Sequence, residues 1–253
     1  MAAGYGQLCP FSLATELLCE RWMLLVVSRL LFGCRRFNEI HRGVPRISPT
    51  LLSKRLAQLE HAGLIETRTA PAGRGKEYLL TRAGRDLEPI VGALAVWGQQ
   101  WARDMDDVDL DPAYLVWSLH LRMNTEAMPP GRTVLEFEFS GAPADCRRFW
   151  LVHEGGEVEM CLKDPELDVD LVVRSDLRLF VEAWRGFRDL QREIRAGRVE
   201  LLGERELQRQ FPGWLKLHAL AAVERLRPGR ERDLARRSRR PRPRPRAPAG
   251  AGR

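Results

Sequence analysis

A capped amphipathic helix followed directly by a basic hairpin constrains the fold of this chain more than any other feature. Ser48 can cap the helix, and Pro49 suits its first position, where a missing N–H costs nothing. Leucines recur from position 52 at i, i+4 and i+7, which predicts an apolar stripe along a helix over residues 49–61. Two short strands, at residues 64–68 and 77–81, should then pair across a glycine-rich tip. The segment therefore predicts a half-buried helix beside a two-stranded wing.

The surrounding segments extend this unit into a winged helix-turn-helix. Helices are expected at residues 10–18, 21–32 and 36–41, and one long helix over residues 82–105 follows the hairpin. In such a module one helix enters the major groove and the basic hairpin lies along the phosphates. The side chains that this arrangement predicts at the DNA are Arg36, Arg46, Ser48, Thr50, Ser53, Lys54, Arg55, Arg74 and Lys76.

Charge is distributed unevenly along the chain, which carries a net +7 overall. Residues 1–82 hold 12 basic and 6 acidic side chains, residues 83–226 hold 18 and 26, and residues 227–253 hold 11 and 2. A winged helix can also serve as a protein-interaction module, but the net +6 of the first block favours nucleic acid as its partner. The acidic middle of the chain should stay away from phosphates.

An acidic stretch around residues 104–112 is the best domain boundary in the sequence. It predicts a winged-helix domain over residues 1–108, a second domain over residues 109–226, and an Arg/Pro-rich tail over residues 227–253 that is expected to be disordered. The second domain has four alternating strands followed by helices, including a last helix near residues 214–226. The fold class is therefore α+β, with a mixed sheet-and-helix domain behind the winged helix.

A run of N-terminal motifs keeps a recognisable order and spacing. It comprises Cys9-Pro10, Trp22, residues 36–40 (RFNEI), 47–56 (ISPTLLSKRL), 59–65 (LEHAGLI), 77–81 (EYLLT) and Gly84. This run resembles the HxlR-type subgroup of MarR-like bacterial transcriptional regulators. The resemblance implies a homodimer that binds a pseudo-palindromic operator in double-stranded DNA, with a dimer interface built from residues 9–18 and 87–101. The sequence departs from the family before Trp22, where Cys19-Glu20-Arg21 replaces the usual Gly-Gly-Lys.

Cys9 has two interpretations. Some members of the resembled family sense electrophiles or oxidants through a cysteine at this position. A sensor thiol needs exposure and a lowered pKa, and the start of a helix, where Cys9 precedes Pro10, can supply the second of these. The alternative is a packed structural thiol with no redox role.

The second half of the chain resembles a sterol-carrier-protein-type-2 domain over residues 131–220. The matching landmarks are a strand at 168–174 followed by Ser175-Asp176, and the segment 197–203 followed by a helix. The resemblance implies a cavity that holds an apolar ligand, so the domain is either a sensor of a small-molecule effector or only a rigid dimerisation extension. The residues that would line it are Phe137, Phe139, Trp150, Met160, Phe180 and Trp184, which can equally form an ordinary core.

Several other functions are disfavoured by what the sequence lacks. The five histidines form no HExxH motif, no GxSxG is present, and the five cysteines form no CxxC pair, so neither an enzyme, a metal site nor a cofactor is expected. Apolar runs are too short to cross a membrane, and no secretory leader is visible, so a cytoplasmic protein is expected. The sequence thus predicts a ligand-controlled DNA-binding regulator. The alternatives are regulation through Cys9, or a lipid carrier whose winged helix only dimerises.

Overall fold

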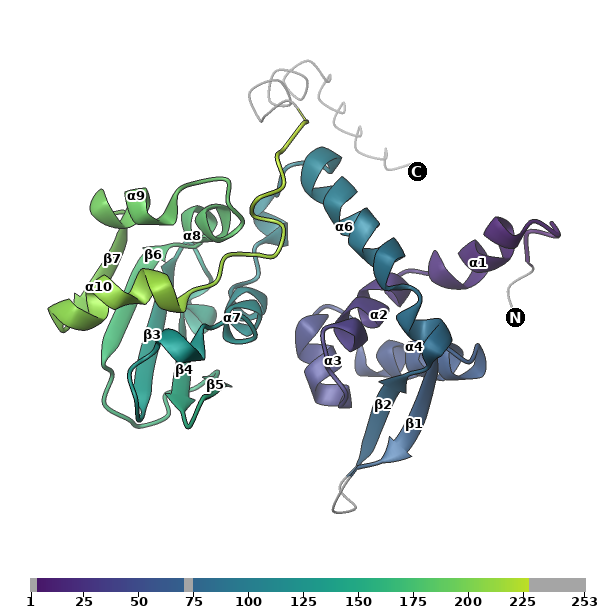
Figure 1. Cartoon of the computed structure of the whole chain (residues 1–253), viewed down its shortest axis with the longest axis horizontal. Coiled ribbons are helices and arrows are strands. Elements are labelled where there is room, and N and C mark those ends of the chain that lie inside the picture. Colours follow the sequence, from purple (N-terminus) through teal and green to yellow (C-terminus); the bar gives the residue numbers. More distant parts are fainter. Residues whose placement is uncertain (1–3, 71–74, 228–253) are drawn as a thin grey trace, which may run out of the picture.

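The computed structural model describes residues 4–70 and 75–227. Its N-terminal part is a bundle of short helices with a two-stranded wing (Figure 1). Its core is drawn mainly from helices α2, α3 and α4, and includes Met23, Ile40, Leu52, Leu56 and Leu59. The elements of this part are α1 (Pro10–Leu18), α2 (Met23–Leu31), α3 (Phe37–Gly43), α4 (Pro49–His61), β1 (Ile65–Thr69), β2 (Lys76–Leu80), α5 (Arg82–Arg85) and α6 (Glu88–Trp101).

Local chemistry explains where these helices begin. The Ser48 hydroxyl accepts a hydrogen bond from the Leu51 N–H at 3.3 Å, which confirms the predicted cap of α4. The long helix expected over residues 82–105 is instead two helices, α5 and α6. Pro89 has no N–H to continue the first helix, and its ring would clash with the carbonyl four residues earlier, so the chain breaks and restarts with Pro89 in the first turn.

The entry to α2 differs from the prediction as well. The sequence predicts a helix from residue 21, but α2 begins at Met23 because Trp22 lies in the left-handed region, with φ at 78°. That conformation is uncommon for any residue with a side chain. It falls at the point where Cys19, Glu20 and Arg21 replace the usual motif, and Glu20 has a structural partner there that is described below.

The second domain is a five-stranded mixed sheet packed on one face by helices. Its strand order is β5-β4-β3-β6-β7, with β3 and β6 parallel and the other neighbours antiparallel. The elements are α7 (Pro112–His120), β3 (Thr133–Ser140), β4 (Arg148–Glu154), β5 (Glu157–Cys161), β6 (Leu171–Asp176), α8 (Leu177–Trp184), α9 (Leu190–Arg195), β7 (Val199–Gly203) and α10 (Arg205–Trp214), together with short 3-10 turns at Asp107–Asp109, Thr125–Ala127 and Ala144–Cys146.

The last helix lies earlier than predicted. It is α10, which ends at Trp214, and its Phe211 and Trp214 are fully buried in the second core. Residues 215–227 form no helix, because this segment instead bonds to other parts of the fold. The His218 N–H donates to the Trp184 carbonyl at 3.0 Å, and the Leu226 N–H donates to the Gln100 carbonyl at 3.1 Å.

Helix α7 and the C-terminal segment join the two domains. Trp117 of α7 is 4% exposed and packs in the core of the winged helix, although the sequence assigns it to the second domain. A Cβ placed on Gly43 at the end of α3 would lie 2.7 Å from the Trp117 ring, so the helices touch closely here. Near the end of the described chain, Arg225 donates to the Ala102 carbonyl and pairs with Asp104 at 2.5 Å.

Candidate DNA-binding surface and neighbouring sites

Helix α4 presents one polar, solvent-exposed face. Leu52, Leu56 and Leu59 are turned into the core, so the helical period places the small polar residues on the other side. Thr50, Ser53 and Lys54 are all exposed, as the pattern predicts. A face of short side chains lets a helix approach base edges closely, and the single ammonium adds attraction to phosphate.

The wing stands beside α4 as a regular antiparallel pair. Its register runs from Ile65 opposite Leu80 to Thr69 opposite Lys76, and Lys76 is exposed. Arg74, predicted at the wing tip, lies outside the described residues. The Tyr78 N–H also donates to the Arg35 carbonyl at 2.8 Å, which ties the wing to the chain just before α3.

Arg36 and Arg68 add cations near the wing. The Arg36 side chain is 57% exposed and lies 4.0 Å from the Glu77 carboxylate, a spacing that leaves its guanidinium available to a stronger anion. Arg68 is exposed on β1 and pairs with Glu66 at 2.5 Å. It is not among the predicted contacts, although a cation one residue before the end of the first wing strand is the signal that points to it.

Arg55 does not belong to this surface, which corrects the sequence-based prediction. It is 8% exposed, and its Nε donates to the Arg21 carbonyl at 2.9 Å. Its guanidinium also pairs with the Glu20 carboxylate and donates to Gln58 Oε1 at 2.6 Å. Position 55 lies three residues from both Leu52 and position 58, so the helix turns it towards the bundle rather than the solvent.

Ser48 and Arg46 are exposed but already engaged. The Ser48 hydroxyl is the cap of α4 described above, and that role places it at the start of the polar face. Arg46 donates a hydrogen bond to the Val108 carbonyl in the linker between the domains. Each side chain remains accessible to a phosphate, with Arg46 also holding the linker against the helix-turn-helix.

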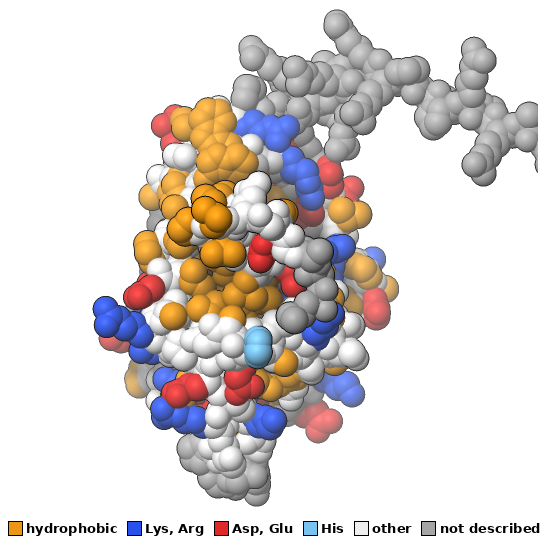
Figure 2. Space-filling model, turned by 90° about the vertical axis from the view of Figure 1, so that its right-hand side faces the viewer, with side chains coloured by type: hydrophobic (Ala, Val, Ile, Leu, Met, Phe, Trp, Pro, Cys, Tyr) orange, Lys and Arg blue, Asp and Glu red, His pale blue; other side chains and the backbone are white. Residues whose placement is uncertain are grey.

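A second exposed surface is apolar and lies on α1 and α6. Trp97 is 59% exposed and Phe11 is 76% exposed, far more than core side chains of their size. Figure 2 shows a band of hydrophobic side chains running down this side of the molecule. Large contiguous apolar patches on a soluble domain mark interaction surfaces. The exposed apolar residues of these segments are Leu8, Phe11, Leu13, Ile90, Leu94, Trp97 and Trp101.

Cys9 lies next to this apolar surface, at the N-terminus of α1. It is the residue before Pro10 and is exposed to solvent. The backbone N–H groups of Ser12 and Phe11 lower the pKa of its thiol, because a helix N-terminus stabilises the thiolate. By contrast, burial raises the pKa of the Cys34 thiol to about 11.

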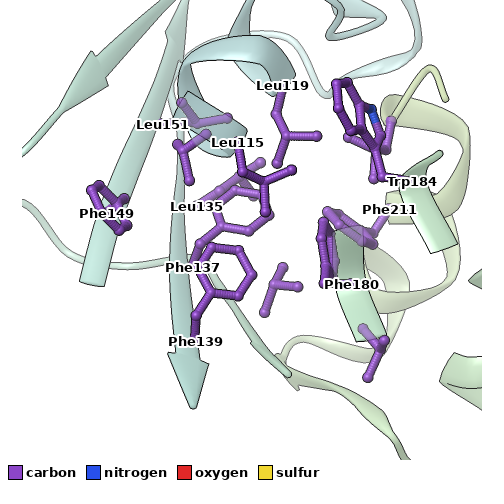
Figure 3. Close-up of a cluster of buried hydrophobic side chains, with 14 of the residues drawn as sticks. Leu115, Leu119, Leu135, Phe137, Phe139, Phe149, Leu151, Phe180, Trp184 and Phe211 are labelled. Atoms are coloured by element: carbon purple, nitrogen blue, oxygen red, sulfur yellow. The ribbon is translucent and has the colours of Figure 1, made fainter. Parts of the chain in front are cut away.

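The aromatic residues predicted to line an apolar cavity are mostly packed against one another. Phe137, Phe139 and Phe180 are fully buried, and their rings converge between β3 and α8 with centroids 5.5 to 6.1 Å apart (Figure 3). Trp184 joins the same core, and Met160 lies at its edge. Trp150 does not join it. It lies opposite Glu136 in the register of β4 and β3, so its side chain points to the opposite face of the sheet from that of Phe137.

The described residues contain no group of three or more His, Cys, Asp or Glu side chains placed to hold a metal ion. In the same residues no helix is long and apolar enough to cross a membrane.

The capped helix, the wing and the exposed polar face together define a winged helix-turn-helix of the DNA-binding class. A family model described as HxlR-like helix-turn-helix matches residues 17–106. The uncharacterized HTH-type transcriptional regulator YvaP of Bacillus subtilis is 36% identical over 112 residues, which are 44% of this chain and 96% of that protein. The HTH-type transcriptional regulator YodB of the same organism is 33% identical over 103 residues, covering 40% of this chain and 92% of YodB.

A solved structure of YodB in its reduced form shares 31% sequence identity with this chain, covers 40% of it and 100% of the YodB chain, and superposes with a TM-score of 0.35. The sequence relatives decide the assignment. The chain belongs to the HxlR-like helix-turn-helix family and is a DNA-binding transcriptional regulator.

Proposed function

We propose that the chain binds a pseudo-palindromic operator as a homodimer, with α4 in the major groove and the wing on the phosphates. The observation that carries the proposal is the exposed polar face of α4, where Thr50, Ser53 and Lys54 stand clear of the core. Lys76 and Arg36 extend the positive charge towards the wing. A dimer of such modules reads two half-sites about one helical turn apart.

The exposed surface on α1 and α6 supports the dimer. Two tryptophans, Trp97 and Trp101, are 59% and 45% exposed on one helix, and Phe11 of α1 is more exposed still. Burying aromatic rings of this size is worth roughly 25 cal/mol for each Å² removed from water. A second copy of the same surface would bury them by two-fold symmetry.

A mobility-shift titration tests the DNA-binding proposal. The duplexes are the region upstream of the gene that encodes the chain and a scrambled sequence of the same length. The specific duplex should shift at lower protein concentration than the scrambled one, and the advantage should shrink in Ser53→Ala, because a hydroxyl on the exposed polar face of α4 can bond to a base edge. His61→Ala, at the last position of the same helix, is the control. Equal affinity for both duplexes would refute specific recognition by α4. So would an equal loss of affinity in the two variants on both duplexes.

A second function rests on Cys9, whose exposed thiol has a lowered pKa. We infer that an oxidant or electrophile that modifies this thiol alters the adjoining α1 surface and so releases DNA. Titrating the Cys9 thiol with iodoacetamide across pH should show it reacting at lower pH than Cys34. Cys9→Ser should abolish release of the operator by N-ethylmaleimide, which adds to a single thiolate and needs no second cysteine; an unchanged response would exclude this route.

For the second domain we propose a sterol-carrier-like fold with an effector role. The support is a mixed sheet whose helix-covered face carries a cluster of aromatic rings. Since Phe137, Phe139 and Phe180 contact one another, an apolar ligand has to separate these rings to enter. A thermal-shift panel of fatty-acyl and sterol-like compounds tests the idea. Stabilisation lost in Phe180→Ala but kept in Trp150→Phe, on the opposite face, is the expected outcome.

A further inference from the structure

A small cavity lies at the junction of the two domains, outside the sheet core discussed above. It has a volume of about 160 Å³ and is bounded by α2 on the winged-helix side. Helix α7, the end of α8 and the C-terminal segment form its other walls, and it opens to solvent beside the exposed Phe32 and Leu121. Aromatic rings dominate its walls, namely Phe32, Tyr114, Trp117 and Trp184.

The cavity is also cationic. Arg29 is only 9% exposed, and its guanidinium reaches the Ser28 hydroxyl at 3.1 Å and the Tyr114 hydroxyl at 3.4 Å. Within the described residues no carboxylate forms an ion pair with Arg29, and no Asp or Glu lines the cavity. The partners of this guanidinium are hydroxyls and aromatic rings, which do not neutralise its positive charge, so an anion placed beside it would gain a charge-assisted pair at a site that is already desolvated.

Two further groups make the cavity a donor-rich site. Arg122 lines it, and among residues 4–70 and 75–227 its one side-chain hydrogen bond is from Nε to the Leu217 carbonyl at 2.9 Å. His218 Nδ1 accepts from the Leu220 N–H at 3.2 Å, which leaves the proton of a neutral ring on Nε2 as a donor. Burial lowers the pKa of His218 to about 4, and three nearby arginines add to the shift, so the ring is neutral and surrounded by positive charge.

Size and walls specify the rest of the ligand. A cavity of roughly 150 Å³ holds benzene, so this one admits a single aromatic ring with a small substituent. The guanidinium carbon of Arg29 lies 5.2 Å from the Phe32 ring centre and 5.4 Å from the Trp117 ring centre, so cation and rings share one wall. We propose that the cavity binds a small aromatic carboxylate, whose carboxylate group pairs with Arg29 and Arg122 while its ring lies among the aromatic walls.

The location couples such a ligand to the helix-turn-helix. A Cβ on Gly43 would meet both Arg29 Cδ at 2.5 Å and the Trp117 ring, so these two wall residues touch the last residue of α3. Gly43 is followed directly by the turn that leads to α4. A ligand that displaces Arg29 or Trp117 therefore shifts the turn that orients α4. This regulatory consequence rests on the proposed operator binding; ligand binding itself does not.

Isothermal titration of the full chain tests the site directly. Benzoate is the probe, benzamide is its neutral isostere, and acetate is a carboxylate without the ring. Benzoate should bind at least ten-fold more tightly than either, because only it satisfies both the cations and the aromatic walls. Absence of benzoate binding at millimolar concentration, or equal affinity for benzamide, overturns the proposal.

Variants locate the bound anion. Arg122→Gln should weaken benzoate binding about ten-fold or more, whereas Arg132→Gln, an exposed arginine of the same domain, should leave it unchanged. Arg29→Met should abolish binding, with thermal unfolding showing whether the variant is folded; Arg122→Gln decides the matter if it is not. Unchanged affinity in folded Arg122→Gln refutes the site. If the chain binds benzoate but shifts no DNA, the site is supported and the operator proposal is refuted. If the chain binds its operator but not benzoate, the site is refuted and the operator proposal stands.

Discussion

Two adjacent residues of α4, Lys54 and Arg55, carry like charges but should fail in opposite ways when replaced. Lys54 is exposed on the polar face, whereas the Arg55 side chain is 10% exposed and pairs with the Glu20 carboxylate. Sequence alone places both at the DNA. The structure separates them, so paired substitutions test its account of this helix.

The expected magnitude for Arg55→Met follows from its contacts. Methionine keeps much of the apolar stem but removes donors to the Arg21 carbonyl, to Gln58 and to Glu20. Breaking a buried pair costs about 3 to 5 kcal/mol. The Glu20 side chain is 35% exposed and can recover part of its hydration, so we expect a loss of about 2 to 3 kcal/mol in unfolding free energy. For a chain of this size that lowers Tm by about 4 to 12 °C.

Lys54→Ala should change unfolding free energy by less than about 0.5 kcal/mol, because the side chain is on the surface. It should instead lower the DNA affinity and make it less sensitive to salt. The slope of log K against log salt concentration should become shallower by about 0.9 for each phosphate that the lysine neutralises in the wild-type complex. Urea unfolding and salt-dependent fluorescence anisotropy, measured well below Tm, give both quantities for both variants. A stable Arg55→Met protein with a reduced salt slope would show that the guanidinium meets phosphate after all. In a double-mutant cycle, Glu20→Gln should remove part of the Arg55→Met cost.

Four other outcomes can be measured. Replacing both Trp97 and Trp101 with serine should shift sedimentation from dimer to monomer and lower Tm, because each ring is about half buried within the protomer and the dimer adds to the stability of the fold; an unaltered dimer would remove α6 from the interface. Gly43→Val should destabilise the chain by about 1 to 3 kcal/mol in urea, since its Cβ would lie within 3 Å of the Arg29 side chain and the Trp117 ring, and a neutral effect would contradict the packing at the domain junction. The Asp176 carboxylate caps α8 by accepting from the Leu179 N–H at 3.0 Å, so Asp176→Ala should lower the free energy of unfolding by about 1 kcal/mol, whereas Asp176→Asn should keep most of the wild-type stability. The pKa of His218 is lowered to about 4 in the folded chain against about 6.5 when unfolded, so the unfolded state takes up the proton first as pH falls; stability should drop between pH 6.5 and 4 by up to about 3 kcal/mol, and His218→Gln should flatten that part of the pH profile.

Much of the winged helix is open to prediction because its signals are local. A serine cap, a proline in the first turn and leucines at helical spacing act within a few residues, and they place α4 at Pro49–His61 as expected. The exposed polar face follows from the same period. The alternating strands of the second domain are likewise short-range patterns, although the strand expected at residues 168–174 lies at Leu171–Asp176.

Errors arise where a local pattern competes with a distant partner. Residues 215–227 carry apolar positions that suit a helix, yet their N–H groups and side chains bond to α6 and to Trp184 instead. Arg55 looks like any other cation in a basic helix until Glu20, thirty-five positions earlier, is placed against it. Nothing in the spacing of single residues encodes those meetings.

By itself, the sequence determined the module, the family and the exposed polar face of α4, because the hydrophobic period, the caps and the turn residues all act within a single element. Only the tertiary structure decided which charges are free and which are paired, that Trp117 of the second domain packs in the first core, and that Arg29 is enclosed by aromatic rings at the domain junction. Those outcomes depend on which surfaces meet when the helices of the winged helix pack and when the two domains dock. Burial and desolvation then set the free energy of each charge.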